Sequence, residues 1–535
     1  MGRHDDSYNI RVKAAKIARD RNHADTHQNN GEENKYKDAD GNRNFIANYT
    51  KGFRHHPKTD RDAGEVINPD YRKLLDAIKS EKPDDFENLT LRLGRKLTNP
   101  QAGFAYDLQG PDSQDVKIRR APKIDSAEAA GEMAEVYWMA LCRDVPFGTF
   151  DANSTVGEAV ADLSTNYSDF PHSPFPGPAV PINSNTIFRG ATEGDRIGPY
   201  ISQFLYKPIL WGPQKLEQVQ RVLKNIDYLT DYDSWLKAQD GEDIPIDDDL
   251  EPPETNVRHI LTPRDLAYYV HVDALYQAYL GACLILIRDE NKSDPLLPYQ
   301  DSSKQIGFGT FGGPHILSLV TEVATRALKA VWFQKWGVHR RLRPEAFGGL
   351  IHRQKNSGSP SPTPDLTPPN PAYLINTEVL NSAVLPKIFT KYNSYLLPQA
   401  FPEGSPTHPS YGAGHATVAG ACVTILKAWF DENDTIKNPK RPTADGTGIE
   451  DATGLSLKVG DELNKVAANI AIGRSWAGVH YRSDYTESIV LGEKVALGLL
   501  QEQATCYHKD DPFTCTLRRF DRKQIKFEGT KITEI

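Results

Sequence analysis

The sequence has little that would tie it to a membrane or to nucleic acid. No apolar run approaches the length needed to cross a bilayer, and the stretch Met1–Asp25 contains no apolar segment of signal-peptide length. We therefore expect a protein without membrane spans, and a cytoplasmic rather than a secreted one. Its 63 Lys and Arg residues are outnumbered by 71 Asp and Glu residues, and no strongly basic segment is present. This balance argues against nucleic acid as a partner.

Cysteine is also scarce. The 535 residues contain only five cysteines, and their spacing matches no metal-binding motif. Cys142, Cys283 and Cys422 lie in apolar stretches, so we expect them to behave as small core residues. Cys506 and Cys515 flank a short polar segment, where a disulfide loop and two free thiols are both compatible with the sequence.

Strand signals are few, and no fixed-period repeat is present. Residues 1–125 are polar and broken by Gly and Pro, which predicts a peripheral N-terminal arm with short helices that packs on the main body. Residues 126–535 carry long apolar-periodic stretches and predict a mainly α domain built from helix bundles. Residues 237–255 and 354–371 predict connecting loops. The strongest helix candidates are 126–145, 266–287, 314–336, 414–430, 460–475 and 483–503.

A turn of small residues enters the apolar helix 414–430, with His408 before the turn and His415 just inside the helix. The start of a helix exposes unpaired backbone N–H groups, here including that of Gly414, and the positive end of the helix dipole. These groups attract anions, so the turn predicts an oxyanion site.

Two cations follow the helix candidate 314–336. Lys335 continues its apolar stripe one turn past Val331, so the ammonium is expected to point toward the core. Arg343 precedes Pro344, which favours an extended backbone at Arg343. Taken alone, this segment is more typical of a solvated basic end of a helix.

A third cation, Arg474, shares a helix face with Ile470, and His480 and Asp484 lie four residues apart at the start of the next helix. A carboxylate one turn from an imidazole can accept one ring N–H and leave the other nitrogen as a ligand or nucleophile. Most such pairs, taken alone, are structural. Together with Lys335 and Arg343, however, they form a donor set suited to a tetrahedral oxyanion.

Taken in chain order, the three segments 335–343, 408–415 and 474–484 resemble the signature of the vanadium-dependent haloperoxidases. This family shares an ancestral site with the type 2 phosphatidic acid phosphatases. The resemblance is strongest to the algal-type bromoperoxidases and extends to residues 187–204, 271–286 and 317–331. It implies a fold of two four-helix bundles. It also implies oxidation of bromide, and of chloride or iodide, by hydrogen peroxide to hypohalous acid, which halogenates small organic acceptors.

The resemblance also implies roles for individual residues. His415 would hydrogen-bond the apical hydroxide of vanadate and act as acid and base, and His408 would lie near the halide. The family usually has Ser at the position of Ala413, so one hydroxyl donor is missing. At about 1.5–3 kcal/mol for such a hydrogen bond, we expect vanadate affinity to be about 10- to 100-fold weaker. The implied vanadate-binding groups are Lys335, Arg343, Arg474, the Gly414 amide and the axial ligand His480, with Asp484 behind it.

The residues expected in the halide pocket resemble those of two subtypes of the family, the bromoperoxidases and the chloroperoxidases. His408 stands where bromoperoxidases have His, whereas Trp332 resembles the Trp of the chloroperoxidase pocket, although ordinary helix packing explains Trp332 equally well. A bulky aromatic side chain makes a drier pocket and helps to strip water from chloride. We expect bromide oxidation with some chloride activity.

Two other functions are compatible with these residues. An acid phosphatase would use His480 as the nucleophile and form a phosphohistidine, and a non-catalytic oligomer would bind phosphate for structure only. The seven residues between Lys335 and Arg343 match the bromoperoxidases and favour the haloperoxidase. The resemblance further implies a homo-oligomer, a dodecamer. A calcium ion, held by some relatives in the loop 297–309, is doubtful because Asp301 is the only acidic residue there.

Overall fold

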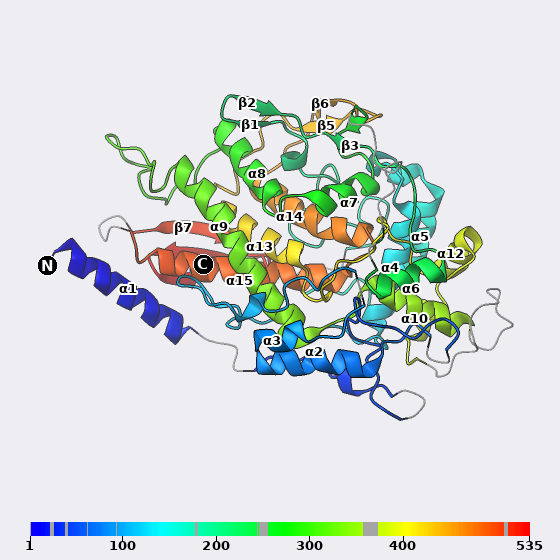
Figure 1. Ribbon diagram of the computed structural model, residues 1–535. Coiled ribbons are helices and arrows are strands. Elements are labelled where there is room, and N and C mark those ends of the chain that lie inside the picture. The colour runs from blue at the N-terminus through cyan, green and yellow to red at the C-terminus, as the bar shows by residue number, and fades with distance from the viewer. Residues whose placement is uncertain are drawn as a thin grey trace.

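The computed structural model describes residues 2–21, 26–37, 41–60, 63–92, 94–176, 180–242, 244, 255–356, 373–507 and 512–535. The chain is mainly helical, as its periodicity predicts, and its strands are short (Figure 1). The helices are α1 (Arg3–Asp20), α2 (Asn68–Ser80), α3 (Pro83–Glu87), α4 (Ala127–Cys142), α5 (Ser154–Thr165), α6 (Tyr232–Gln239), α7 (Pro263–Val272), α8 (Gln277–Arg288), α9 (Gly313–Trp332), α10 (Pro344–Asn356), α11 (Thr377–Leu380), α12 (Val384–Tyr392), α13 (Gly414–Lys427), α14 (Val459–Trp476) and α15 (Arg482–Gln503). The strands are β1 (Ile209–Trp211), β2 (Gln214–Leu216), β3 (Gln220–Arg221), β4 (Val257–Arg258), β5 (Lys440–Pro442), β6 (Ile449–Asp451), β7 (Thr514–Arg518), β8 (Gln524–Glu528) and β9 (Lys531–Glu534). Most of the two predicted loops, 237–255 and 354–371, lies outside the described residues.

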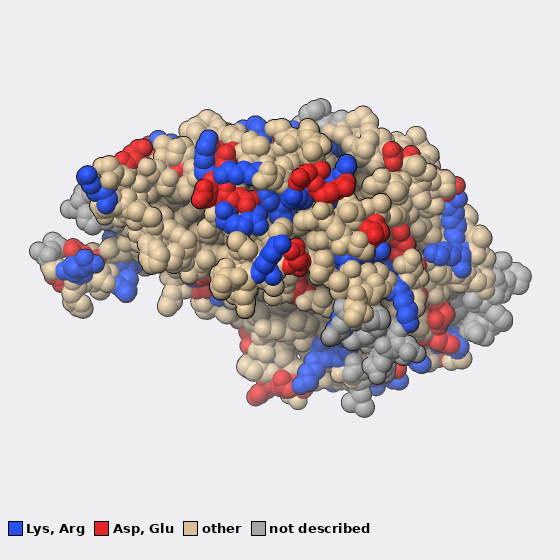
Figure 2. Space-filling view, turned by 90° about the horizontal axis from the view of Figure 1, so that it is seen from above, with Lys and Arg blue, Asp and Glu red and all other residues tan. Residues whose placement is uncertain are grey.

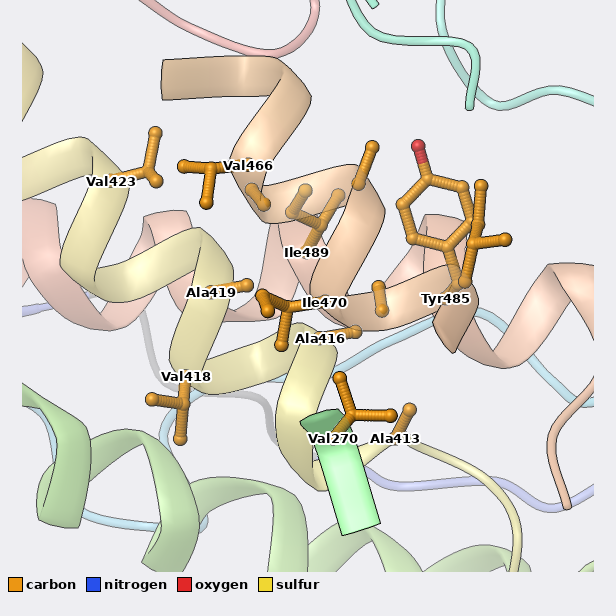
Figure 3. Close-up of a cluster of buried hydrophobic side chains, with 14 of the residues drawn as sticks. Val270, Ala413, Ala416, Val418, Ala419, Val423, Val466, Ile470, Tyr485 and Ile489 are labelled. Carbon is orange, nitrogen blue, oxygen red and sulfur yellow. The ribbon is translucent and has the colours of Figure 1, made fainter. Parts of the chain in front are cut away.

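The core forms around α13, which packs against α9, α14 and α15. Figure 3 shows apolar side chains that α13, α14 and α15 contribute to this core, with Val270 of α7 beside them. Small residues let α13 and α15 approach closely, because a Cβ atom on Gly420 would lie 2.0 Å from the Ile489 carbonyl oxygen. A Cβ on Gly492 would lie equally close, at 2.0 Å, to the Thr417 carbonyl oxygen. These close contacts join α13 and α15, whose first turns carry His415 and Asp484.

The helix predicted over 266–287 is wrong as a single element. The chain leaves the helical conformation after Val272, where Asp273 takes an extended backbone with φ −63° and ψ 146°, and α8 begins only at Gln277. The axes of α7 and α8 differ in direction by 101°. Apolar residues continue through the break without Gly or Pro, so the sequence pattern does not mark it.

The helix predicted over 314–336 also changes character at its end. After α9 the chain continues as a π-helical segment, Phe333–His339, in which Lys335 is fully buried. π-Helical turns are rare and occur mostly at functional sites. The inward direction predicted for Lys335 is confirmed.

The N-terminal residues form two different structures. α1 extends away from the body and contains no buried residue (Figure 1). Farther along, Phe45, Tyr49, Phe53 and Tyr71 form a second apolar cluster around Trp336, next to the π-helical segment. The division of the chain at residues 125 and 126 stays a prediction.

All five cysteines are unpaired. Cys142, Cys283 and Cys422 are buried, which confirms that they are core residues. Cys506 and Cys515 are two free thiols, one exposed and the other buried. The sequence was compatible with a disulfide loop or with two free thiols, and the structure shows the two free thiols.

No single helix among the described residues is long and apolar enough to cross a membrane. The bent pair of α7 and α8 meets the length and composition criteria only when the two are joined. On the surface, acidic and basic side chains interleave over the face seen from above (Figure 2). The β5–β6 hairpin follows this pattern, with the ion pairs Lys440–Asp451 and Arg441–Glu450.

Candidate active site

Arg343 joins the three segments that carry the predicted site residues. It lies just before α10 and is 1% exposed. Its Nε donates a hydrogen bond to the carbonyl oxygen of His408 (3.0 Å), and Nη2 lies 2.9 Å from His408 Nδ1. Its Nη1 donates to the Val479 carbonyl oxygen (2.8 Å) and lies 2.9 Å from His480 Nε2. One guanidinium thus connects the turn before α13 with the residues before α15.

Lys335 enters the same site from the π-helical segment. Its Nζ donates to the carbonyl oxygens of Pro409 (2.7 Å) and Ser410 (3.1 Å) and lies 5.7 Å from the centroid of the Trp332 ring. Burial, and then the charge of Arg343, holds the pKa of Lys335 well below its usual value. The ammonium is therefore placed where a nearby anion would stabilise it.

His480 and Asp484 form the pair that their spacing predicts. His480 Nδ1 lies 2.7 Å from Asp484 Oδ2, and both side chains are buried. Burial would raise the pKa of Asp484, but Arg341 and the His480 N–H lower it well below its usual range. Burial and the charge of Arg343 lower the pKa of His480. The imidazole is thus neutral, and this contact assigns its proton to Nδ1 and the lone pair to Nε2.

The start of α13 presents free backbone donors. Ala413 is the N-cap residue and offers no capping side chain. The amides of Gly414 and His415 therefore have no acceptor among the described residues. Gly414 lies against the Trp332 indole, since a Cβ there would be 3.2 Å from Trp332 Cζ3. These free donors and the positive end of the helix dipole are suited to an anion.

His415 pairs with a residue that the sequence analysis did not find. His415 Nε2 lies 3.0 Å from Asp273 Oδ1, at the break between α7 and α8. His271, two residues before Asp273, lies 3.2 Å from Glu403. Its pKa is lowered to about 3, by burial and then by the charge of Arg474, so it is neutral beside the site. An acidic residue inside an apolar run was the only sequence signal for Asp273.

The third predicted cation, Arg474, donates from Nη1 to the Val270 carbonyl oxygen (2.8 Å), while its Nε is buried without a partner among the described residues. Burial lowers its pKa, and its charge in turn lowers the pKa of Arg343 to about 10, after the larger effect of burial. None of Lys335, Arg343 and Arg474 forms an ion pair with a carboxylate in the described part of the chain. A set of unpaired buried cations with an orphaned N–H fits an oxyanion such as vanadate.

The predicted halide residues are in contact. The rings of Trp332 and His408 lie 4.9 Å apart at 43°, and Trp332 Nε1 donates to the Thr98 carbonyl oxygen (3.1 Å). Burial, and then Lys335 and Arg343, lowers the pKa of His408 well below its usual value. Neutral His408 and the indole therefore form one wall beside the ammonium. Asp301, in the loop considered for calcium, is exposed.

Comparisons with known proteins agree with this arrangement. A family model described as the VCPO second helical-bundle domain matches residues 389–508. The vanadium-dependent bromoperoxidase of Corallina officinalis is 38% identical over 97% of this chain and 98% of its own length. That of Ascophyllum nodosum is 35% identical over 81% of this chain and 78% of its own.

A solved structure matches nearly the whole chain. The second vanadate-dependent bromoperoxidase of Ascophyllum nodosum superposes with a TM-score of 0.86 at 27% identity and covers 99% of this chain and 92% of its own. That relative is a homohexamer, so it does not support the dodecamer expected from the resemblance. With near-complete coverage at 38% identity, the chain belongs to the family of the vanadium-dependent bromoperoxidases.

Proposed function

We propose that the chain oxidises bromide with hydrogen peroxide to hypobromous acid, with vanadate as its cofactor. The observation that carries this proposal is the set of three cations without a carboxylate partner among the described residues, two of them buried and Arg474 half-buried, around a neutral histidine whose Nε2 bears the lone pair. Family membership supports the same reaction.

In this proposal, the chain binds vanadate by charge and by one ligand bond. Lys335, Arg343 and Arg474 neutralise the oxygens, the Gly414 amide donates to one of them, and His480 Nε2 is the metal ligand. Vanadate supplies a Lewis acid that activates peroxide for attack by halide. The Asp484 carboxylate accepts the His480 N–H and so keeps the lone pair on the ligating nitrogen.

His415 is the proposed acid and base. The Asp273 carboxylate accepts a hydrogen bond from its Nε2, which fixes the ring and leaves Nδ1 to take or give the proton of peroxide. The wall formed by Trp332 and His408 is the proposed halide site. We further propose a homo-oligomer, as in the solved relative.

Restoring a hydroxyl at residue 413 should tighten cofactor binding. We expect Ala413→Ser to lower the dissociation constant for orthovanadate by about 10- to 100-fold, because a hydrogen bond to a charged group contributes about 1.5–3 kcal/mol. Serine is also a better N-cap than alanine, so the variant should be more stable to unfolding by about 1 kcal/mol. Calorimetric titration of the vanadate-free protein measures the first effect. An unchanged constant would contradict the proposed place of residue 413.

The halide pocket gives a second prediction. Trp332→Arg should lower the ratio of chloride to bromide oxidation rates by about tenfold or more, equivalent to about 1.4 kcal/mol of barrier. The reason is that loss of the indole admits water, and the more strongly hydrated chloride suffers most. Trp332→Phe is the matched control, because it keeps an aromatic face, and its ratio should stay near that of the wild type. Steady-state rates of chloride and bromide oxidation measure this ratio. Equal ratios in the wild type, Trp332→Arg and Trp332→Phe would show that Trp332 does not line the halide pocket.

The proposed reaction is tested directly by monochlorodimedone bromination, measured with peroxide and bromide before and after incubation with orthovanadate. We expect activity that depends on vanadate and that phosphate suppresses, because the cations recognise charge and tetrahedral shape. Hydrolysis of p-nitrophenyl phosphate by the vanadate-free sample, without any bromination, would instead support the phosphatase.

A further inference from the structure

We propose that Arg341 and Glu132 are a positioning pair that holds Asp484, and through it the ring of His480, in the orientation needed for ligation. Neither residue touches the anion site, and both act through the carboxylate behind His480. The inference rests on the proposed role of His480 as the metal ligand.

The two oxygens of Asp484 have different partners. Oδ2 accepts from His480 Nδ1 (2.7 Å), from the Tyr481 amide (3.2 Å) and from the Ser410 hydroxyl. On Oδ1, Arg341 Nη1 at 2.8 Å is the donor found among the described residues. Asp484 is fully buried, so loss of Arg341 would leave Oδ1 without this donor in the interior, at a cost in free energy. The orientation of the carboxylate plane therefore depends on Arg341.

Arg341 is itself held on several sides. Its Nη1 also donates to Ser483 Oγ (2.9 Å), its Nη2 donates to Glu132 Oε2 (3.0 Å), and the guanidinium carbon lies 3.8 Å from the centroid of the Tyr481 ring. A planar guanidinium with two nitrogens on two carboxylates has one allowed orientation. Lysine could keep the charge and one hydrogen bond but not this geometry.

Glu132 anchors the pair to the scaffold. It lies on α4, is 2% exposed, and its Oε1 accepts the Ser483 amide in the first turn of α15. Three ionisable side chains, those of Glu132, Arg341 and Asp484, thus run from α4 to His480, and each is at most 3% exposed. The orientation of the His480 ring therefore depends on the position of the core helix α4.

The chain also offers a matched control. Arg482 and Glu135 form a second buried ion pair between α15 and α4, with Arg482 Nε 2.9 Å from Glu135 Oε2. This pair has similar burial and is also anchored on α4, but no hydrogen bond among the described residues joins it to Asp484. Loss of either pair should affect folding alike, whereas only loss of Arg341 should disturb His480.

The test compares two anions on vanadate-free protein by calorimetric titration. Orthovanadate forms a bond to His480 in this proposal, whereas inorganic phosphate is held by charge and hydrogen bonds only. We expect Arg341→Met to weaken orthovanadate about 10- to 100-fold more than it weakens phosphate, as is typical for residues that orient a metal ligand. Arg341→Lys should recover part of this selectivity, and Arg482→Met should leave the ratio of the two constants unchanged.

If Arg341→Met does not fold, the two anions are compared on Glu132→Gln and Arg341→Lys instead. We expect each of these variants to lose less of its selectivity for orthovanadate over phosphate. Equal weakening of both anions, or the same change of ratio in Arg482→Met, would overturn the positioning role. The wild-type protein separates this outcome from failure of the proposed function. If the proposed function is wrong, the wild-type protein would bind orthovanadate without brominating monochlorodimedone.

Discussion

A His480→Ala protein is expected to lose its retention of vanadate, with a dissociation constant raised by more than about 100-fold. Changes behind a metal ligand alone cost 10- to 100-fold in affinity, so removal of the ligating nitrogen should cost more. Phosphate should still bind to this variant, because Lys335, Arg343 and Arg474 are intact. Equilibrium dialysis or calorimetry with both anions measures the difference.

The control for this prediction is a second buried histidine outside the site. His352 on α10 accepts a hydrogen bond from the Tyr395 amide (3.1 Å) and is 1% exposed. His352→Ala should lower stability without changing vanadate affinity. Vanadate binding by His480→Ala at wild-type strength would contradict the assignment of the metal ligand.

A His415→Ala protein is expected to behave in the opposite way. It should bind vanadate almost as well as the wild type but turn over bromide about 10²- to 10⁴-fold more slowly, the usual contribution of a positioned acid and base. The reason is that His415 is held by Asp273, at the break between α7 and α8, and has no hydrogen bond to the cation set among the described residues. Steady-state bromination, with vanadate affinity measured on the same sample, separates the two effects.

Asp273→Asn provides the companion measurement. An amide in place of the carboxylate can still hydrogen-bond His415 but no longer stabilises its charged form, so turnover should fall by less than in His415→Ala. A parallel loss of vanadate binding and turnover in either protein would show that His415 serves cofactor binding and not proton transfer.

The sequence was sufficient for the parts of the site that depend on local pattern. Lys335 points inward because it continues a helical stripe, and His480 meets Asp484 because they lie one helical turn apart. Each is a consequence of 3.6 residues per turn. The mainly helical fold follows from the same periodicity.

Pairs between distant segments could not be predicted in this way. His415 and Asp273 lie 142 residues apart, and Arg341 and Glu132 lie 209 apart. Neither member of these pairs has a local feature that specifies its partner, because the contact depends on how α4, α7 and α13 pack. The break after Val272 was missed for a related reason, since apolar residues on both sides of Asp273 are equally compatible with a continuous helix.

The direction of the Lys335 side chain depends on the number of residues in the π-helical segment between α9 and α10. A π-helix has i→i+5 hydrogen bonds and so winds less per residue than an α-helix, and one residue fewer in this segment would swing the ammonium away from the carbonyl oxygens of Pro409 and Ser410. Substitutions nearby can change what surrounds the lysine. Evolution can redirect the lysine itself only through insertions and deletions, and these are rarer events than substitutions.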